Sequence, residues 1–430
     1  MIEIQAPRER AILVGAPLKG LPQGLADEYL EELGRLADTA GAEIVGSVRQ
    51  KLDSPHPKLY IGQGKAEELR DEVSAKDGTL IIFDEELTPA QGKNLEEFTG
   101  TRVMDRAEVI LDIFATRART AEARMQVELA QLQYMLPRLT RMWVHLSRVR
   151  GGIGMRGPGE TQLETDRRMI NQRIARLKED LARVARQRAT QRKGRSDLLR
   201  AALVGYTNAG KSSILRALSG SDVFVEDRLF ATLDAATRAV ELGEGYEALV
   251  TDTVGFIRKL PHHLVASFRA TLEESAEADL LLHVIDLSHP TWEEQKTVVE
   301  EVLAGLGLAE RRTALVFNKI DRLTHDEEAS WRQRAEATYP TPAVFVSTVE
   351  QGGIEPLRDF LREEVRRQRS EVSITLPASQ GGLLAEIYRE GEVLDREDNG
   401  AEINLRARLS AATLGRLRAR DGVEVRGDGG

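Results

Sequence analysis

An eight-residue segment at 205–212 constrains the fold of this chain more than any other part of its sequence. The segment is GYTNAGKS, and it follows a short apolar run at 201–204 that predicts a buried strand. A stretch with helical spacing, which includes Leu215 and Leu218, comes directly after it. The pattern G-x-x-x-x-G-K-[ST] between a strand and a helix is typical of a loop that binds phosphate. We therefore predict a P-loop α/β domain with a mainly parallel sheet around these residues.

The residues of this loop predict how a nucleotide is held. Glycines let backbone N–H groups close around phosphate oxygens, and the helix N-terminus adds partial positive charge. We expect Lys211 to act in catalysis by reaching the β- and γ-phosphates, and Ser212 to bind Mg²⁺ through its hydroxyl. The residues expected to contact the nucleotide here are Gly205, Tyr206, Thr207, Asn208, Ala209, Gly210, Lys211, Ser212 and Ser213.

A second motif, D-x-x-G, follows another apolar run at 249–251. Asp252 would support Mg²⁺ through a water molecule. The backbone N–H of Gly255 would contact the γ-phosphate during catalysis. Both residues lie where a predicted strand ends, which is where open α/β sheets bind ligands.

A third motif, N-K-x-D, predicts which base the site selects. Asn318, Lys319 and Asp321 follow an apolar run at 314–317. The Asp321 carboxylate can accept hydrogen bonds from N1–H and the 2-amino group of guanine, a donor pair that adenine lacks. Asn318 would tie this segment to the phosphate loop, and the stem of Lys319 would cover the face of the base.

Ser347 and Thr348 complete the series, because they follow a fourth apolar run and could contact guanine O6 through their backbone. A single motif can arise by chance, whereas four in the expected order, each after a predicted strand, are specific. The chain should therefore contain a domain that binds GTP and GDP and hydrolyses GTP.

The segment FATLD at 230–234 predicts the part of the site that responds to Mg²⁺. Thr232 lies between the phosphate loop and Asp252, so we expect it to bind the metal and to act in catalysis, with Phe230 near the nucleotide. Two alternatives stay open: Thr232 is an ordinary loop residue, or Thr237 has this role.

One expected catalytic group is missing. GTPases of the Ras type place a Gln directly after the D-x-x-G glycine to orient the attacking water, and this chain has Phe256 there. Arg228 and Arg238 flank Thr232, but neither is an obvious arginine finger. We therefore expect slow hydrolysis until a partner completes the site. A second hypothesis is that Asn208 helps to hold a K⁺ ion against the phosphates.

The rest of the chain divides into three further parts. Residues 1–112 alternate strand-like runs at 11–14, 42–45 and 80–83 with helical ones, which predicts a small α/β domain. A helical coiled-coil hairpin is expected at 113–199, the GTPase domain at 200–368, and a small α+β tail domain at 369–430. The last four residues should be disordered.

Two runs of apolar residues predict the hairpin. Their steps of four and three are typical of a coiled-coil seam, so two antiparallel helices can satisfy each other within a monomer. Pro137 should kink the first helix, and a Gly-rich loop at 151–159 should join the two. The runs are Met125, Leu129, Leu132, Leu136, Leu139, Trp143 and Leu146, and then Ile170, Ile174, Leu177, Leu181 and Val184.

Charge is distributed unevenly along the chain. The net charge is −9, yet residues 166–200 contain twelve Lys or Arg and only four Asp or Glu. Arg150 and Arg156 extend this basic region around the Gly-rich loop. One interpretation is that these charges only form a solvated helix face without a binding role. A one-sided charge in an acidic chain instead favours contact with a phosphate backbone.

With these motifs, the chain resembles the HflX family of ribosome-associated GTPases. The most specific match is GPGETQLE at 157–164 followed by DRR at 166–168, and GYTNAGKS, FATLD, DTVGFI and NKID also fit. The resemblance implies that the chain binds the large ribosomal subunit, with its N-terminal domain and hairpin reaching ribosomal RNA. It also implies splitting or rescue of stalled ribosomes under stress. Ala235 and Ala236 depart from the family pattern after FATLD, and Ser-Thr-Val at 347–349 departs from the usual Ser-Ala-Lys.

Two other functions stay open. The protein could be a GTP-sensing RNA-binding or ribosome-assembly factor that needs no turnover in its main action, or a GTPase that serves RNA modification. The sequence has no cysteine, no signal-like N-terminus and no apolar run long enough to cross a bilayer. We therefore expect a cytoplasmic protein without a membrane span.

Overall fold

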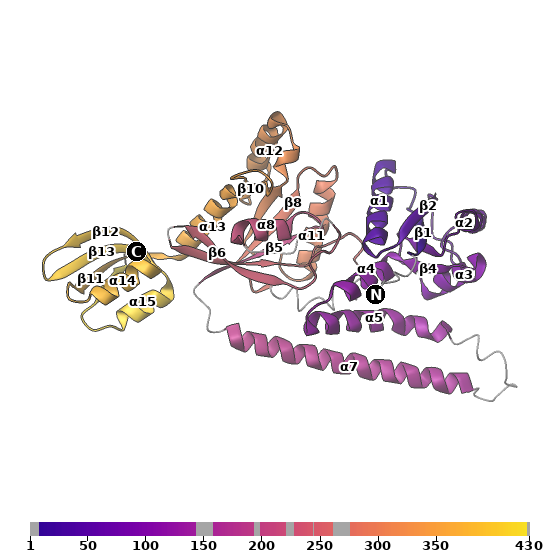
Figure 1. The fold of residues 1–430 in the computed structure, drawn as a ribbon, viewed down its shortest axis with the longest axis horizontal. Helices are drawn as coiled ribbons and strands as arrows, with labels where there is room; N and C mark the ends of the chain where they lie inside the picture. Colours follow the sequence, from indigo (N-terminus) through magenta and orange to yellow (C-terminus); the bar gives the residue numbers. More distant parts are fainter. Residues whose placement is uncertain are drawn as a thin grey trace, which may run out of the picture. The chain divides into compact units, whose positions relative to one another are not determined.

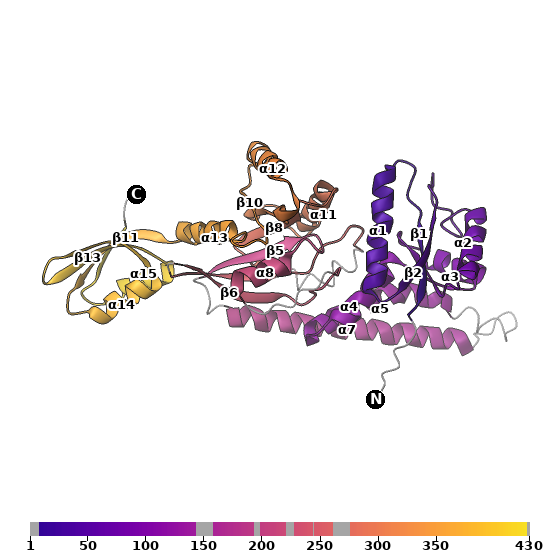
Figure 2. The ribbon, with the colours of Figure 1, turned by 45° about the horizontal axis from the view of Figure 1, so that its top comes forward.

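The computed structural model describes residues 8–142, 158–192, 198–220, 228–243, 245–260 and 276–427. Its chain forms two compact units, coloured along the sequence in Figures 1 and 2. The first unit comprises Met1–Arg186 with the short segments Asp227–Asp234 and Lys259–Ala270. The second comprises Gln187–Glu226, Ala235–Arg258 and Thr271–Gly430. The predicted Arg150, Arg156, loop 151–157 and the heptad positions Trp143 and Leu146 lie outside the described residues.

The N-terminal domain is a parallel sheet covered by helices, as its alternating pattern predicted. The strand order is β2-β1-β3-β4, and each neighbouring pair is parallel. Strand β3 is buried at every position because both faces of the sheet are covered. The elements are β1 Arg10–Gly15, α1 Gln23–Thr39, β2 Glu43–Arg49, α2 Gln63–Ala75, β3 Leu80–Phe83, α3 Pro89–Thr99, β4 Arg102–Asp105 and α4 Arg106–Arg117.

The hairpin consists of α5 Ala121–Met142 and α7 Pro158–Arg192, which run side by side in both views (Figures 1 and 2). On α7, Leu177 is buried, and the other four predicted seam positions are half-buried between exposed residues. Arg173 ties the two helices together, since its Nε and Nη2 each lie 2.7 Å from a carboxylate oxygen of Glu128. Helix α7 already includes Pro158 and Gly159, so the Gly-rich loop ends two residues earlier than the sequence predicts.

Helix α5 has a second buried face that the heptad pattern did not show. Ala123, Val127, Ala130 and Tyr134 are buried, and the helix packs on α3 and α4. The hydroxyl of Tyr134 donates to Asp105 at 2.9 Å. The helix therefore belongs to the N-terminal core as well as to the hairpin, and the predicted boundary at 112/113 falls inside α4.

The second unit begins with a six-stranded sheet of order β10-β9-β8-β5-β7-β6. Five strands are parallel, and β6 is antiparallel to β7. This mainly parallel sheet confirms the predicted fold class. Its elements are β5 Leu199–Gly205, α8 Lys211–Ser219, β6 Ala236–Gly243, β7 Tyr246–Asp252, β8 Leu280–Asp286, α11 Trp292–Gly305, β9 Thr313–Asn318, the 3-10 turn Ile320–Arg322, α12 His325–Thr338, β10 Ala343–Phe345 and α13 Glu355–Gln368.

The C-terminal domain has the element order βαββαβ with an antiparallel sheet of order β12-β13-β11-β14. Val372, Ile374 and Leu376 alternate toward its core, as the strand pattern predicted. The elements are β11 Ser370–Pro377, α14 Gly381–Glu390, β12 Glu392–Asp398, β13 Glu402–Leu409, α15 Ala411–Arg418 and β14 Glu424–Gly427. Gly427, predicted to be disordered, instead ends β14, and residues 428–430 lie outside the described residues.

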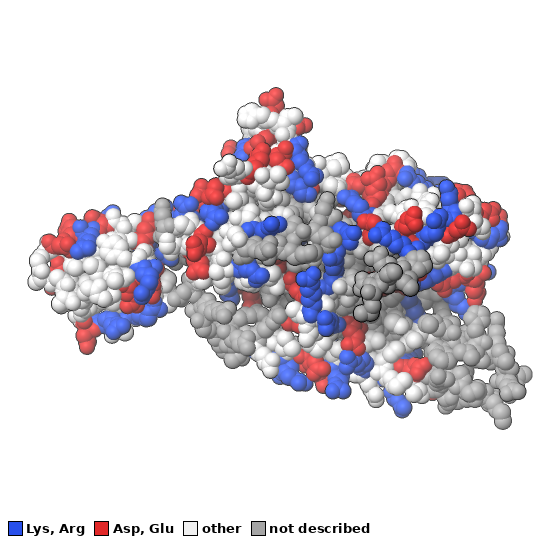
Figure 3. Space-filling view, viewed as in Figure 1, with Lys and Arg blue, Asp and Glu red and all other residues white. Residues whose placement is uncertain are grey.

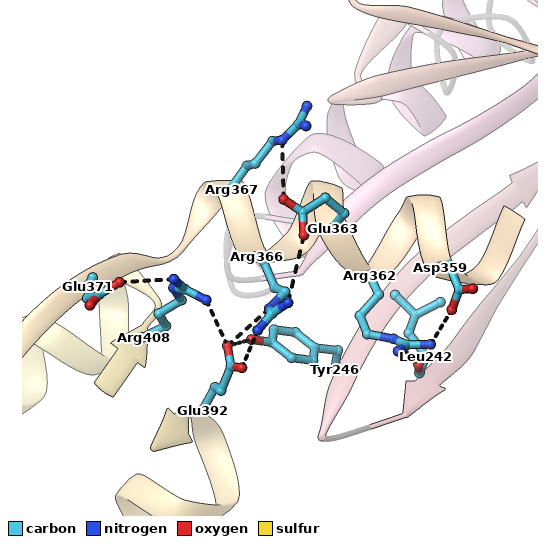
Figure 4. Close-up of polar contacts among 10 residues, drawn as sticks. All are labelled: Leu242, Tyr246, Asp359, Arg362, Glu363, Arg366, Arg367, Glu371, Glu392 and Arg408. Atoms are coloured by element: carbon cyan, nitrogen blue, oxygen red, sulfur yellow. Dashed lines mark hydrogen bonds and ion pairs between the residues drawn. The ribbon is translucent and has the colours of Figure 1, made fainter. Parts of the chain in front are cut away.

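Glu392, at the start of β12, joins this domain to the preceding sheet (Figure 4). Its carboxylate accepts hydrogen bonds from Arg366 Nη2 at 2.5 Å and from the hydroxyl of Tyr246. Arg408 of β13 approaches the same carboxylate at 3.5 Å. Because Arg366 lies on α13 and Tyr246 on β7, one side chain connects three elements of the second unit.

Within the described ranges, no helix combines the length and apolar character that a membrane span requires.

Candidate GTP-binding site

The phosphate loop connects β5 to α8, and two of its glycines are required by close neighbours. Gly210 has φ +98°, and a Cβ there would lie 2.2 Å from Nδ2 of Asn318. A Cβ on Gly205 would lie 2.3 Å from the carbonyl oxygen of Val284. Both positions therefore exclude a side chain, since neither the amide nor the strand can move far in a packed sheet.

Lys211 lies at the start of α8 with its side chain buried. Its Nζ donates to the carbonyl oxygens of Gly205 at 3.1 Å and Tyr206 at 2.9 Å. Burial lowers the pKa of Lys211 to about 8, against an opposing effect of the Asp252 carboxylate. Phosphate groups beside this ammonium would stabilise its charged form, so the geometry favours an anionic ligand.

The side chains of Ser212 and Asp252, the two residues that their motifs predict to support Mg²⁺, lie in contact. The hydroxyl of Ser212 donates to Oδ2 of Asp252 at 2.5 Å, and Asp252 is fully buried. Thr253 holds the end of β7 against β5 by donating to the carbonyl oxygen of Leu203 at 2.6 Å. These hard oxygen donors suit Mg²⁺, which is usually bound by one or two side chains together with phosphates and water.

The N-K-x-D segment is held against the phosphate loop by two side chains. Asn318 Nδ2 donates to the carbonyl oxygen of Ala209 at 2.9 Å. Lys319 has φ +63°, and its Nζ donates to the carbonyl oxygen of Asn208 at 3.0 Å and to Asp286 Oδ2 at 2.6 Å. Sequence reasoning missed Asp286, although its position at the end of the buried strand β8 was a usable signal.

Asp321 is oriented by Ser347. The hydroxyl of Ser347 donates to Asp321 Oδ1 at 2.7 Å, and accepts from the backbone N–H groups of Val349 and Glu350, each at 3.2 Å. The sequence predicts only a backbone role for Ser347. Its fully buried side chain instead fixes the carboxylate that is expected to recognise guanine.

The residues after D-x-x-G are bound to the phosphate loop through their backbone. Thr207 N–H donates to the Phe256 carbonyl oxygen at 2.7 Å, and Phe256 N–H donates to the Gly205 carbonyl oxygen at 3.0 Å. Phe256 is 2% exposed. A buried ring cannot orient a water molecule, so this position does not supply the group that a Gln provides in Ras-type enzymes.

Thr232 lies in a short segment at 228–234, here called the first switch segment, which belongs to the first unit. The ring of Phe230 packs edge-on against Phe114 with centroids 4.7 Å apart. Asp234 accepts from the N–H groups of Arg119 at 3.0 Å and Thr120 at 3.2 Å, and from the Thr120 hydroxyl at 2.5 Å. The metal-binding role of Thr232 stays a prediction.

The competing residue, Thr237, lies on β6 in the second unit. Its hydroxyl is 2.9 Å from that of Thr251 on β7. The neighbouring Arg238 donates to the carbonyl oxygen of Thr237 at 2.9 Å. Thr237 is exposed on the edge strand β6, and its side chain already has a partner on the neighbouring strand β7.

A phosphate loop, a D-x-x-G segment and an N-K-x-D segment, brought together at the carboxyl ends of a parallel sheet, define a P-loop GTPase. Three family models match consecutive parts of the chain. They are described as "GTP-binding GTPase N-terminal" over residues 27–115, "GTP-binding GTPase Middle Region" over 117–195 and "50S ribosome-binding GTPase" over 200–319.

The chain belongs to the HflX GTPase family. It is 45% identical to the GTPase HflX of Magnetococcus marinus, over 99% of both chains. It is 41% identical to the GTPase HflX of Escherichia coli, over 91% of this chain and 92% of that one. A crystal structure of a GTP-binding protein from Sulfolobus solfataricus in complex with GDP is 23% identical, with a TM-score of 0.45, over 84% of this chain and 99% of that one. As a member of the HflX family, the protein is a GTPase that binds GTP and GDP.

Proposed function

We propose that this GTPase acts in the cytoplasm on the large ribosomal subunit, where it splits or rescues stalled ribosomes under stress. The N-terminal domain and the hairpin contact ribosomal RNA, and hydrolysis times the release of the protein. Ser212, Thr232 and Asp252 hold Mg²⁺, which supplies electrostatic stabilisation of the transferred phosphoryl group. Two findings support this proposal: the description of the family model at 200–319 names the 50S ribosome, and the charge of α7 suits RNA.

The exposed basic face of α7 carries the proposal. In Figure 3, blue Lys and Arg side chains and red Asp and Glu side chains both lie along the lower edge of the view, where α7 runs. Residues 164–187 of this helix contain seven Lys or Arg and four Asp or Glu. Arg173 and Arg183 pair with the carboxylates of Glu128 and Asp180, and these pairs leave an excess of positive charge along the helix. A phosphate backbone binds such a surface through release of its counterions. The exposed cations in the described part of α7 are Arg167, Arg168, Arg173, Arg176, Lys178, Arg183 and Arg186.

Co-sedimentation with purified large subunits at several salt concentrations tests this step. The triple variant R167A/R168A/R176A should bind about ten-fold more weakly, and the slope of log K against log salt should become shallower by about two to three. R332A/R334A, which removes two exposed arginines from α12, serves as the control and should bind like the wild type. Equal binding by the triple variant would leave α7 as a solvated face and remove its proposed role.

The alternative is a GTP-sensing RNA-binding or assembly factor. The buried Phe256 is the observation in its favour, because this position does not supply a group that orients the attacking water. The two functions differ in one experiment with a non-hydrolysable GTP analogue. A splitting GTPase should complete a single round of subunit separation with the analogue and then fail to recycle. An assembly factor should show no separation at all.

A further inference from the structure

The sheet of the N-terminal domain has a point where its winding direction changes. From β1 the chain passes through α1 to β2 on one side, whereas β3 pairs with β1 on the other side and leads on to β4. Open α/β sheets bind their ligands at such a point, outside the carboxyl ends of the two strands. A ligand site in this sheet would therefore lie among the residues that follow β1 and β3.

Two carboxylates lie at this edge of the sheet. Asp84 and Glu85 follow β3 directly, and both have little exposed side-chain area, at 3% and 12%. Glu85 Oε2 accepts from the N–H of Ala16, the residue after β1, at 3.3 Å. Burial and the carboxylates of Glu85 and Asp84 raise the pKa of Tyr60 to about 12. The point between β1 and β3 is therefore an acidic position with restricted access to water.

Buried carboxylates need cationic partners, and one comes from the same domain. Arg106 Nη1 lies 3.0 Å from Asp84 Oδ1, and its Nη2 lies 2.5 Å from Glu32 Oε1. All three side chains are buried. The guanidinium of Arg106 thus pairs with both Asp84 and Glu32. It contacts Oδ1 of Asp84, and Oδ2 of the same carboxylate contacts a second cation.

That second cation is Lys259. Its Nζ lies 2.9 Å from Asp84 Oδ2 and 3.0 Å from Glu85 Oε1, and 5.6 Å from the ring centre of Tyr29 on α1. Lys259 has φ +52°, a conformation that is uncommon for residues other than glycine. The ammonium group thus lies between two carboxylates and beside an aromatic face, while the Lys259 side chain stays 40% exposed.

Lys259 lies shortly after the D-x-x-G motif, whose Gly255 is expected to contact the γ-phosphate. It lies four residues after Gly255, near the end of residues 256–260, here called the second switch segment. Its neighbour Arg258 belongs to the second unit, and the Arg258 N–H donates to the hydroxyl of Tyr206 in the phosphate loop at 3.0 Å. One peptide bond therefore separates a contact with the phosphate loop from a contact with the N-terminal sheet.

We propose that the acidic position at β1 and β3 is a binding site for an ammonium group whose ligand is Lys259, so that the N-terminal domain senses the nucleotide bound to the same chain. The inference rests on the GTP-binding activity. Contact of Gly255 N–H with a γ-phosphate displaces the second switch segment and competes with the Lys259 contact. GDP lacks that phosphate and leaves the contact in place. Because binding free energies are reciprocal, the Lys259 contact weakens binding of GTP relative to GDP.

The first switch segment supports the same assignment through different residues. Phe230 and Asp234 lie two residues on either side of Thr232, and they contact α4 and the residues just before α5. The segments before β6 and after β7 thus each have an anchor on the N-terminal unit. An incidental surface ion pair would explain only one of them.

The affinities for GDP and for a non-hydrolysable GTP analogue measure the proposed competition. Lys259→Ala should leave GDP affinity unchanged and strengthen analogue binding about five- to ten-fold, within the usual range of coupling between two sites. Glu85→Gln should likewise raise the affinity for the analogue relative to the affinity for GDP. Lys259→Arg keeps the ion pairs and should behave like the wild type. Lys19→Ala, which removes the exposed Lys19–Asp53 pair of the same domain, is the matched control.

Hydrogen exchange in the wild-type protein gives an independent measurement. Backbone N–H groups at residues 14–18 and 83–87 should exchange faster with the analogue than with GDP. An unchanged affinity ratio in Lys259→Ala together with equal exchange in the two nucleotide states would overturn the proposal. Failure of the wild type to bind GDP would instead contradict the GTPase assignment, so the two failures are distinguishable.

Discussion

At the scale of single residues, the phosphate loop and the base-binding segment are interlocked at Gly210. The Asn318 amide occupies the space where a side chain at 210 would begin. Substituting Gly210 therefore affects both the phosphates and the base, because Asn318 must leave Ala209 to make room. This explains why the two motifs, more than a hundred residues apart in the chain, depend on each other.

Gly210→Ala should lower GTP affinity at least about a hundred-fold, because both strain at positive φ and the clash with Asn318 oppose the bound geometry. Nucleotide titration measures the effect. Gly220→Ala is the control, since Gly220 has φ +62° but a Cβ added there would meet no atom within 4 Å. It should cost about 1 kcal/mol of stability and leave affinity intact. Similar loss of affinity in both variants would show that backbone strain alone is responsible.

Several of the residues predicted from the motifs lie in contact in the structure, because each motif follows a strand that ends at the same edge of the sheet. Ser212 and Asp252 lie in contact, and Asn318 reaches the phosphate loop. Asp286 and the hydroxyl of Ser347 were missed because they act on Lys319 and Asp321 through contacts between segments far apart in sequence. A single sequence gives no spacing rule for such pairs.

At the scale of elements, the C-terminal domain depends on Glu392 for its connection to the GTPase sheet (Figure 4). Hydrogen bonds from Arg366 and Tyr246 lower the pKa of the Glu392 carboxyl despite its partial burial. The charged form therefore holds α13, β7 and β12 together. Within the GTPase domain, Arg362 holds α13 against the sheet, since its Nε donates to the carbonyl oxygen of Leu242 on β6 at 2.9 Å.

Glu392→Ala should uncouple the unfolding of the C-terminal domain from that of the GTPase domain. Loss of charged hydrogen bonds costs about 2 kcal/mol at this joint, and calorimetry should resolve a separate transition for the smaller domain. Glu363→Ala is the control, because Glu363 makes longer and more exposed ion pairs with Arg366 and Arg367 on the same helix. A single transition in the Glu392 variant would contradict this account of the joint.

Helices and strands whose apolar residues recur at a regular spacing can be predicted from the sequence. Elements whose buried positions do not follow such a spacing cannot. Strand β11 alternates toward the core and was found from its sequence. Strand β12 has no such alternation, because its residues are exposed or half-buried, so it was missed. Helix α5 was assigned to the hairpin alone, since its heptad positions hid a second buried face whose members are mostly small or polar, such as Ala130 and Gln126.

At the scale of the whole molecule, a buried histidine links stability to pH. His283 lies in the centre of β8 with 1% exposure, and no atom of the described residues accepts or donates at its Nε2. Burial, followed by the charges of Lys296 and Lys211, lowers the pKa of His283 to about 3 from its ordinary 6.5. Between these values the unfolded chain binds a proton that the folded chain does not.

The free energy of unfolding should therefore fall as the pH is lowered below about 6.5, by about 1.4 kcal/mol per pH unit from this residue. Urea unfolding at pH 7.5, 6.5 and 5.5 measures the slope. His283→Leu removes this proton and should reduce the slope by that amount, while carboxylate contributions stay the same in both proteins. Identical slopes would show that His283 is not the linked group.

The proposed function requires a partner to complete a GTPase site in which a buried Phe256 occupies the position of the usual water-orienting residue. The most direct test is steady-state GTP turnover by the purified protein, with and without large ribosomal subunits, in K⁺ buffer and again in Na⁺ buffer. We predict slow turnover alone and stimulation of about a hundred-fold or more by the subunits. A faster rate in K⁺ would support the role of Asn208, and equal rates would remove it. Fast turnover by the protein alone, or no stimulation by the subunits, would contradict the proposed function.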